Sequence, residues 1–228
     1  MTVLLTKSSV KIDKSQNDDW LNAVMYLEPT YNKAVCKGRS EGCFKSCLIH
    51  SGRMPMASAV NARMKRTELY FEQNDLFMMQ LKGEIAGMLA TATKQGKKLA
   101  VRLNGTSDLD FSEVYNAFAM VQFYEYTKRP DLAKKLSSLD NVDITFSKHE
   151  NHSTKSVKYL IDNQINVAVV FDSSKEAIPT IYKGIKVING DKHDRRFEDT
   201  KGRIVGLSLK GSNKVKQIAR ETGFAVSV

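Results

Sequence analysis

The sequence predicts a single α/β domain, residues 1–228, built on a sheet of about six mostly parallel strands. Short apolar segments of strand type alternate with helical segments along the whole chain. Several strand segments are apolar on both faces, as a sheet covered by helices requires. No linker, low-complexity segment or internal repeat divides the 228 residues. One α/β domain is therefore the simplest prediction.

The strand segments end at turn residues or prolines. The first strand, 22–29, ends at Pro29, and the strand 98–105 ends at the turn signal Asn104-Gly105. The remaining strand segments are 121–129, 142–150, 166–174, 183–191 and 202–211. Ligands of open parallel sheets and of barrels bind at the carboxyl ends of the strands, so the residues that follow each strand are candidates for a site.

Helical segments fill the intervals between these strands. The longest, 56–96, has apolar residues spaced by three and four, and Asn74-Asp75 is expected to break it and cap a second helix. The other helical segments are 111–121, 131–139, 153–164 and 213–223. This alternation predicts βαβ units.

The composition indicates a basic protein of a reducing compartment. A formal net charge of +10 favours an anionic partner such as nucleic acid, an acidic protein or a phosphorylated ligand, and it is also typical of a solvated lysine-rich surface. The N-terminal stretch has only a short apolar run, and no run approaches the length of a membrane span. We therefore expect a cytoplasmic protein with no membrane partner.

All three cysteines lie in one loop, 31–53, directly after the first strand. Cys36, Cys43 and Cys47 have the spacing C-x6-C-x3-C. In a reducing compartment such a cluster indicates a metal site or catalysis more than a disulfide framework. Three thiolates from one loop suit a 4Fe–4S cluster, and three protein ligands leave one iron open for a small-molecule ligand.

Other interpretations of the cysteines remain open. His50 extends the pattern to C-x6-C-x3-C-x2-H, and a Cys3His set closes a tetrahedral zinc site. A zinc module of this kind would bind nucleic acid, in agreement with the basic charge. An iron–sulfur protein with a structural or redox-sensing role, and three reduced cysteines with no ligand, are the further alternatives.

Polar residues follow the strands at two places that we single out. Asn104, Gly105, Thr106, Ser107 and Asp108 follow one strand, and turn chemistry explains the first two well.

Tyr126 and Lys128 end the next strand and point the same way, because side chains alternate with period two. They either meet an anionic ligand or form a surface pair that supports the sheet. We interpret His149 and His152 as exposed loop residues, and the charged stretch 191–199 as a solvated loop with exposed ion pairs.

A three-cysteine loop after the first strand of a repeating β/α chain resembles the radical-SAM superfamily. More specifically, the chain resembles the phage proteins of the gene product 88 family over roughly residues 20–215. The matching stretches are CKGRSEGCFKSCLIHSGR, VRLNGTSDLDF, FYEYTKRP, ITFSKHE and VINGDKHDRRFEDTKGRIVGLSLKG.

The resemblance implies a partial (β/α) barrel of radical-SAM type in a protein of the host cytoplasm. It further implies a 4Fe–4S cluster on Cys36, Cys43 and Cys47, whose open iron binds S-adenosylmethionine for radical chemistry. Asp108 would then accept from the methionine amine, and Thr106 and Ser107 would take a carboxylate or ribose.

The sequence departs from the superfamily pattern at the cysteines. The superfamily spacing is C-x3-C-x2-C with an aromatic residue before the third cysteine, whereas here the spacing is longer and Ser46 holds that position. Cluster binding is therefore better supported by the residues than radical catalysis is.

Overall fold

The fold is a nine-stranded, mostly parallel sheet, seen in a computed structural model that describes residues 2–7 and 19–227. The strands are β1 Leu5–Thr6, β2 Trp20–Met25, β3 Lys98–Arg102, β4 Gln122–Thr127, β5 Val142–Ser147, β6 Asn166–Phe171, β7 Ile181–Tyr182, β8 Ile185–Asn189 and β9 Ile204–Ser208. Their order across the sheet is β1-β2-β3-β4-β5-β6-β9-β8-β7. The strands from β2 to β8 in this order are parallel to their neighbours, and β1 and β7 are antiparallel edge strands.

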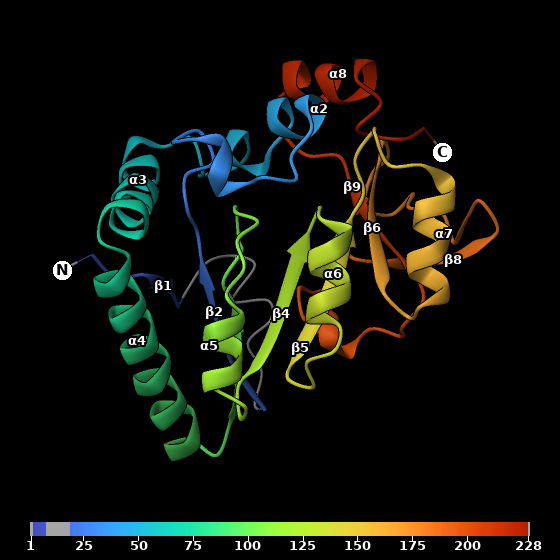
Figure 1. Ribbon diagram of the computed structural model, residues 1–228. Helices are drawn as coiled ribbons and strands as arrows, with labels where there is room; N and C mark the ends of the chain where they lie inside the picture. Colours follow the sequence, from blue (N-terminus) through green and yellow to red (C-terminus); the bar gives the residue numbers. More distant parts are fainter. Residues whose placement is uncertain (1, 8–18, 228) are drawn as a thin grey trace.

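Seven α-helices lie within the described residues. They are α2 Glu41–Lys45, α3 Ala57–Glu72, α4 Asn74–Lys94, α5 Ser112–Ala117, α6 Pro130–Leu136, α7 Thr154–Asp162 and α8 Asn213–Glu221. Three short 3-10 turns are η1 Lys33–Val35, η2 Leu48–His50 and η3 Arg196–Glu198. Figure 1 shows α4, α5, α6 and α7 along the sheet, with α2 and α8 together above the carboxyl ends of the strands.

The prediction of an α/β fold with mostly parallel strands is confirmed. The sheet has nine strands rather than about six, because β1 and β7 have two residues each and carry no periodic signal. The sheet is open, and a barrel of radical-SAM type stays a prediction. None of the helices in the described ranges is long and apolar enough to cross a membrane.

The long helical segment breaks close to where the sequence predicts, but the predicted side-chain cap does not form. Gln73 separates α3 from α4 with φ −140° and ψ 59°. The predicted cap at Asn74 is wrong, because its side chain donates back to the carbonyl of Tyr70 at 3.0 Å. Serine caps begin α7 and α8, where Ser153 and Ser212 accept from the backbone three residues on.

The two faces of the sheet have different coverings. Phe123 packs on Tyr115 of α5, with ring centroids 4.9 Å apart. Its neighbour Tyr124 points to the opposite face, because side chains alternate along a strand, and there it contacts Phe197 of η3 at 5.8 Å. We call the face that η3 covers the inner face.

The charged stretch 191–199 is therefore not a solvated loop. Arg196 is fully buried, and Asp194 and Asp199 are 7% and 9% exposed. Arg196 pairs with Asp199 at 3.0 Å, and Asp194 pairs with Arg102 of β3 at 3.3 Å. The prediction was wrong because the segment between β8 and β9 folds over the inner face. The apolar pattern of a strand does not reveal which segment will cover it.

Candidate functional site at the cysteine loop

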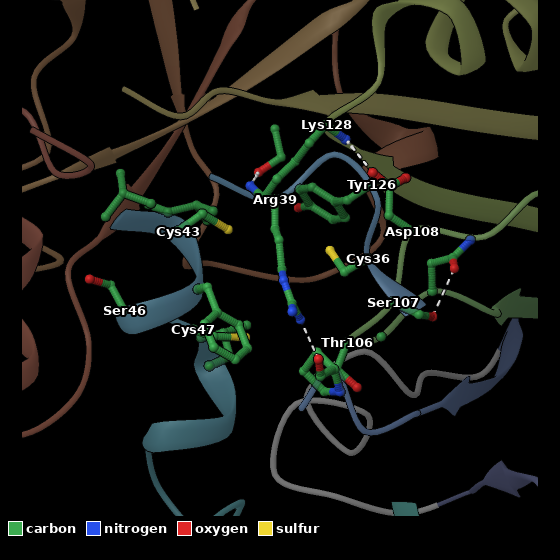
Figure 2. A pocket seen from close by; sticks show the side chains of 18 of the residues that line it. Cys36, Arg39, Cys43, Ser46, Cys47, Thr106, Ser107, Asp108, Tyr126 and Lys128 are labelled. Atoms are coloured by element: carbon green, nitrogen blue, oxygen red, sulfur yellow. Dashed lines mark hydrogen bonds between the residues drawn. The ribbon is translucent and has the colours of Figure 1, made fainter. Parts of the chain in front are cut away.

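A pocket lies between the cysteine loop and the carboxyl ends of the parallel strands (Figure 2). The cysteine loop forms one side, and the loop 104–108 after β3 together with the end of β4 forms the other. The chain after β9 and Phe224 close it. We call this cavity the cysteine pocket.

All ten residues predicted for the site line the cysteine pocket. They are Cys36, Cys43, Cys47, Asn104, Gly105, Thr106, Ser107, Asp108, Tyr126 and Lys128. The structure thus brings the cysteine loop and the two strand ends together, as parallel strands require. Their binding of a cluster or of S-adenosylmethionine stays a prediction.

The first cysteine is fixed by a short extension of the sheet. Cys36 forms an isolated parallel bridge with Asp108, and the amide of Asp108 donates to the carbonyl of Val35 at 2.9 Å. Asn32 begins η1 just before it by accepting from two backbone amides. Cys36 is therefore held beside the end of β3.

The second cysteine is positioned through α2. Ser40 caps this helix by accepting from the Cys43 amide at 3.1 Å. Glu150, after β5, accepts from the Ser40 hydroxyl at 2.7 Å and from the Gly42 amide at 2.8 Å. Burial alone would raise the pKa of Glu150, but these hydrogen bonds hold it below its usual value.

The prediction that His149 and His152 are exposed loop residues was wrong, because His152 is half-buried and His149 is buried. This imidazole is 7% exposed, and its ring centroid lies 3.6 Å from that of His152. Burial is the main cause that lowers the pKa of both rings, and that of His152 falls to about 4. Both imidazoles are therefore neutral near pH 7.

The loop 104–108 is held by its own side chains. Asn104 accepts from the Ser107 hydroxyl at 2.8 Å and from the Leu109 amide at 2.9 Å. Thr106 donates to the carbonyl of Leu27 at 2.5 Å. A Cβ on Gly105 would stand 2.5 Å from the Met25 carbonyl oxygen, so no larger residue fits there.

Glu125 of β4 holds the start of the loop 104–108 through two hydrogen bonds. Its two carboxylate oxygens accept from the amides of Leu103 and Asn104 at 2.7 and 2.9 Å. Burial raises the pKa of Glu125 to about 7. At the point where β3 leaves the sheet, the carboxyl group therefore accepts two backbone hydrogen bonds that a neighbouring strand would otherwise accept.

Asp108 and Lys128 connect the loop 104–108 to β4 and β5. Asp108 accepts from the Thr127 hydroxyl at 2.6 Å and from the Lys128 amide at 3.1 Å. Burial raises the pKa of Asp108, although these two hydrogen bonds oppose the shift. The ammonium of Lys128 donates to Ser147 at 2.7 Å and forms no ion pair within the described part of the chain.

The cysteine side chains surround Arg39. Figure 2 shows the Arg39 side chain running between Cys36, Cys43 and Cys47. Its guanidinium donates to the carbonyl of Pro29 and lies 3.9 Å from the ring centroid of Phe44.

Burial keeps two of these thiols protonated in the metal-free protein. It raises the pKa of Cys36 to about 12, and it also raises the pKa of Cys47. A bound metal would reverse this, because coordination deprotonates a thiol.

The positions of the possible ligands also bear on the alternative of a site for one metal ion, such as zinc. In residues 2–7 and 19–227, no three His, Cys, Asp or Glu side chains are close enough together to hold one metal ion. His50, the fourth ligand of the zinc alternative, is exposed and does not line the cysteine pocket.

Sequence reasoning missed three cations of the cysteine pocket: Arg39, Arg102 and Lys210. Arg102 lies 4.5 Å from the ring centroid of Tyr126. A signal for Arg102 existed, because it is a charged residue at the end of the apolar strand KLAVR. Lys210 had none, because it follows a strand like any other surface lysine.

Fold and site together define an α/β protein with a cysteine-lined pocket at the carboxyl edge of a parallel sheet. The sequence matches the gene product 88 family over residues 3–227, nearly its whole length. The chain therefore belongs to the gene product 88 family, a family of phage proteins. No curated protein and no solved structure matches the chain.

Proposed function

We propose that this protein holds a 4Fe–4S cluster on Cys36, Cys43 and Cys47 and binds a small molecule at the fourth iron. One observation carries the proposal. The three cysteines of the chain come from a single loop and line one pocket at the carboxyl ends of parallel strands. That is where ligands of α/β sheets bind.

The donor set fits an iron–sulfur cluster better than a single ion. Three thiolates are soft ligands of the kind that iron–sulfur clusters use. In a cluster each cysteine binds a different iron, so the sulfur atoms stand farther apart than around one zinc ion. All three cysteines line one cavity, whereas His50, the fourth ligand of a zinc site, does not.

The strand order supports a partial barrel of radical-SAM type. From β2 to β6, each strand pairs with the next one along the chain. Successive right-handed crossovers place the connecting helices on one face of such a sheet. The segment 191–199 covers the other face, so the strand ends are the part of the sheet that is available to a cluster and its ligand.

The residues opposite the cysteines suit a zwitterionic ligand such as S-adenosylmethionine. Lys128 supplies a cation without an ion-pair partner in the described residues, and it would bind a carboxylate. Asp108 supplies a carboxylate on the same wall that would accept from an amine. The loop 104–108 and Tyr126 would exclude water from this ligand.

When bound and reduced, the cluster would supply an electron to a ligand held at its open iron. The contribution of this chain is to place the three thiolates, to orient the ligand and to hold its charges. A non-catalytic role in redox sensing uses the same residues without turnover.

The test is iron and sulfide content after anaerobic purification or reconstitution. We expect about four irons and four sulfides per chain and a brown colour in the wild type. Cys36→Ala, Cys43→Ala and Cys47→Ala should each lose most of this content.

Ser46→Ala is the matched control. Ser46 lines the same pocket, and its buried hydroxyl has no hydrogen-bond partner within the described residues. This variant should keep its iron and sulfide. A colourless wild-type protein that contains one zinc, lost in His50→Ala, would overturn the proposal.

A further inference from the structure

A second pocket adjoins the cysteine pocket at the β8–β9 side of the sheet. The two cavities share Ser51 and Lys210 in their walls. The second pocket is lined further by Lys175, Lys192, His193 and the chain 190–194 after β8. The two cavities therefore meet at these two residues.

The walls of the second pocket carry an excess of positive charge. Its two carboxylates already have partners of their own. Asp191 accepts from the Lys210 ammonium and from the amide and hydroxyl of Ser208, at 2.8 and 2.6 Å. Asp194 pairs with Arg102 in the wall of the cysteine pocket, at 3.3 Å.

Two further lysines in the wall of the second pocket are exposed. Lys175 and Lys192 are exposed side chains that form no ion pair within the part of the chain that the structure describes. His193 already has neighbours at both ring nitrogens, with Nε2 3.9 Å from an Asp199 oxygen and Nδ1 3.5 Å from the Arg196 guanidinium. The second pocket therefore presents two ammonium groups that form no ion pair within the described residues.

The backbone beneath these lysines is fixed. Asn189 donates to the carbonyl of Lys175 at 2.9 Å and accepts from the amide of Asp191 at 3.0 Å. The Gly190 amide donates to the carbonyl of Gly206 in β9 at 2.8 Å. Asn189 thus ties the Lys175 side of the pocket to the Asp191 side.

We propose that the second pocket binds the phosphate groups of a small-molecule substrate whose other end lies in the cysteine pocket. The identification of that molecule as a substrate rests on the proposed function, but phosphate binding itself does not. Several ammonium donors around one cavity match the several oxygens of a phosphate group. A short concave pocket suits a terminal phosphate, whereas a nucleic-acid backbone needs a long basic groove with exposed aromatic rings.

Calorimetric titration of the metal-free protein with inorganic pyrophosphate tests this proposal. We expect saturable binding by the wild type at constant ionic strength. The double variant Lys175→Ala/Lys192→Ala should weaken the affinity by about tenfold or more, since it removes two ammonium donors from the pocket and tenfold corresponds to about 1.4 kcal/mol. Both side chains are exposed, so the variant should keep the melting temperature of the wild type.

Lys134→Ala/Lys158→Ala is the matched control. It removes the same charge from α6 and α7, where both lysines are exposed and far from the second pocket in sequence. The control should bind pyrophosphate within about twofold of the wild type.

Three results would overturn the proposal: no binding by the wild type, an equal loss in both double variants, or tighter binding of a single-stranded oligonucleotide with the same lysine dependence. The titration uses no iron, so its result is independent of cluster content. A protein that binds pyrophosphate without ever holding iron would refute the proposed function and keep the phosphate site.

Discussion

Glu125 is the buried group on which the ligand-facing loop 104–108 depends most. Its side chain is inaccessible to solvent, and its two oxygens serve two different backbone amides. An unsatisfied buried amide costs free energy comparable to a lost hydrogen bond. One carboxyl group in β4 therefore holds the start of the loop opposite the cysteines.

Glu125→Gln should destabilise the protein by about 1–3 kcal/mol. The amide side chain turns an N–H group toward one of the two backbone amides, which then has no acceptor. Denaturant unfolding measures the change in free energy. A variant as stable as the wild type at pH 5 would show that the two contacts have no net effect.

The same substitution has a pH dependence with a defined sign. Folding raises the pKa of Glu125 from 4.5 to about 7, so this group stabilises the fold most below pH 4.5 and loses that contribution as the pH rises through 7. The variant lacks this titration. The stability difference between wild type and variant should therefore shrink from pH 5 to pH 8.

At the level of single side chains, the sequence revealed the residues of the pocket better than their partners. The cysteines and the two strand ends could be predicted because their place follows from strand order. The burial of Arg102 and Arg196 could not, because the stretch that covers them is as polar as an exposed loop. Its burial depends on pairings with Asp194 and Asp199 that form only in the folded chain.

Among the secondary-structure elements, α2 matters most for the site because it carries Cys43 and has only five residues. A helix this short is not stable by itself. Glu150 holds its first turn, and α8 packs against it, with Thr222 close to Gly42. Two segments distant in sequence therefore position the middle cysteine.

Glu150→Ala should loosen α2 and expose Cys43, which is 7% exposed in the fold. We expect this thiol to react several-fold faster with a thiol reagent in the metal-free variant, because local opening becomes easier. Glu41→Ala is the control, since Glu41 is exposed on the same helix and its ion pair among the described residues is with Lys45. Equal reaction rates in both variants would contradict the role of Glu150.

Gly42→Ala tests how closely α2 is packed. A Cβ at this position would stand 2.6 Å from the Thr222 hydroxyl and 2.7 Å from a Glu150 oxygen. We expect a loss of about 1–3 kcal/mol in unfolding free energy and a lower cluster content.

Gly83→Ala, in α4, is the matched helical control, because a Cβ added at this position would have nothing within 4 Å. It should gain roughly 0.5–1 kcal/mol through reduced chain entropy. Stabilisation by both substitutions would show that α2 has room to move.

Most secondary-structure elements could be predicted from the sequence, because their periodicity is long and their ends carry turn residues. Strands β3, β4, β5, β6, β8 and β9 fall within the predicted segments. The cap at Asn74 failed because its side chain has a competing acceptor, the carbonyl of Tyr70. The short edge strands depend on their neighbours in the sheet and have no sequence signal of their own.

The molecule as a whole has one main hydrophobic core. A single cluster of buried side chains extends from Leu4 to Ile204 and includes residues of the sheet and of the helices on its outer face. The tryptophan of the chain, Trp20 at the start of β2, packs on Phe197 with ring centroids 4.7 Å apart. This contact joins β2, the first parallel strand, to the segment that precedes β9.

We therefore predict one cooperative unfolding transition for the metal-free protein. Trp20 fluorescence and far-ultraviolet circular dichroism should give the same denaturant midpoint, because the contact with Phe197 is lost only when the common core unfolds. Two separate midpoints would show that the chain forms two domains.

The central claim is that the cysteine pocket holds a cluster with one iron open to a ligand. Electron paramagnetic resonance of the reduced, anaerobically prepared protein tests it most directly, with and without S-adenosylmethionine. The account predicts a 4Fe–4S signal that shifts when S-adenosylmethionine is added. A cluster signal that ignores S-adenosylmethionine would contradict this ligand, and a sample without any cluster signal after reconstitution would contradict the claim itself.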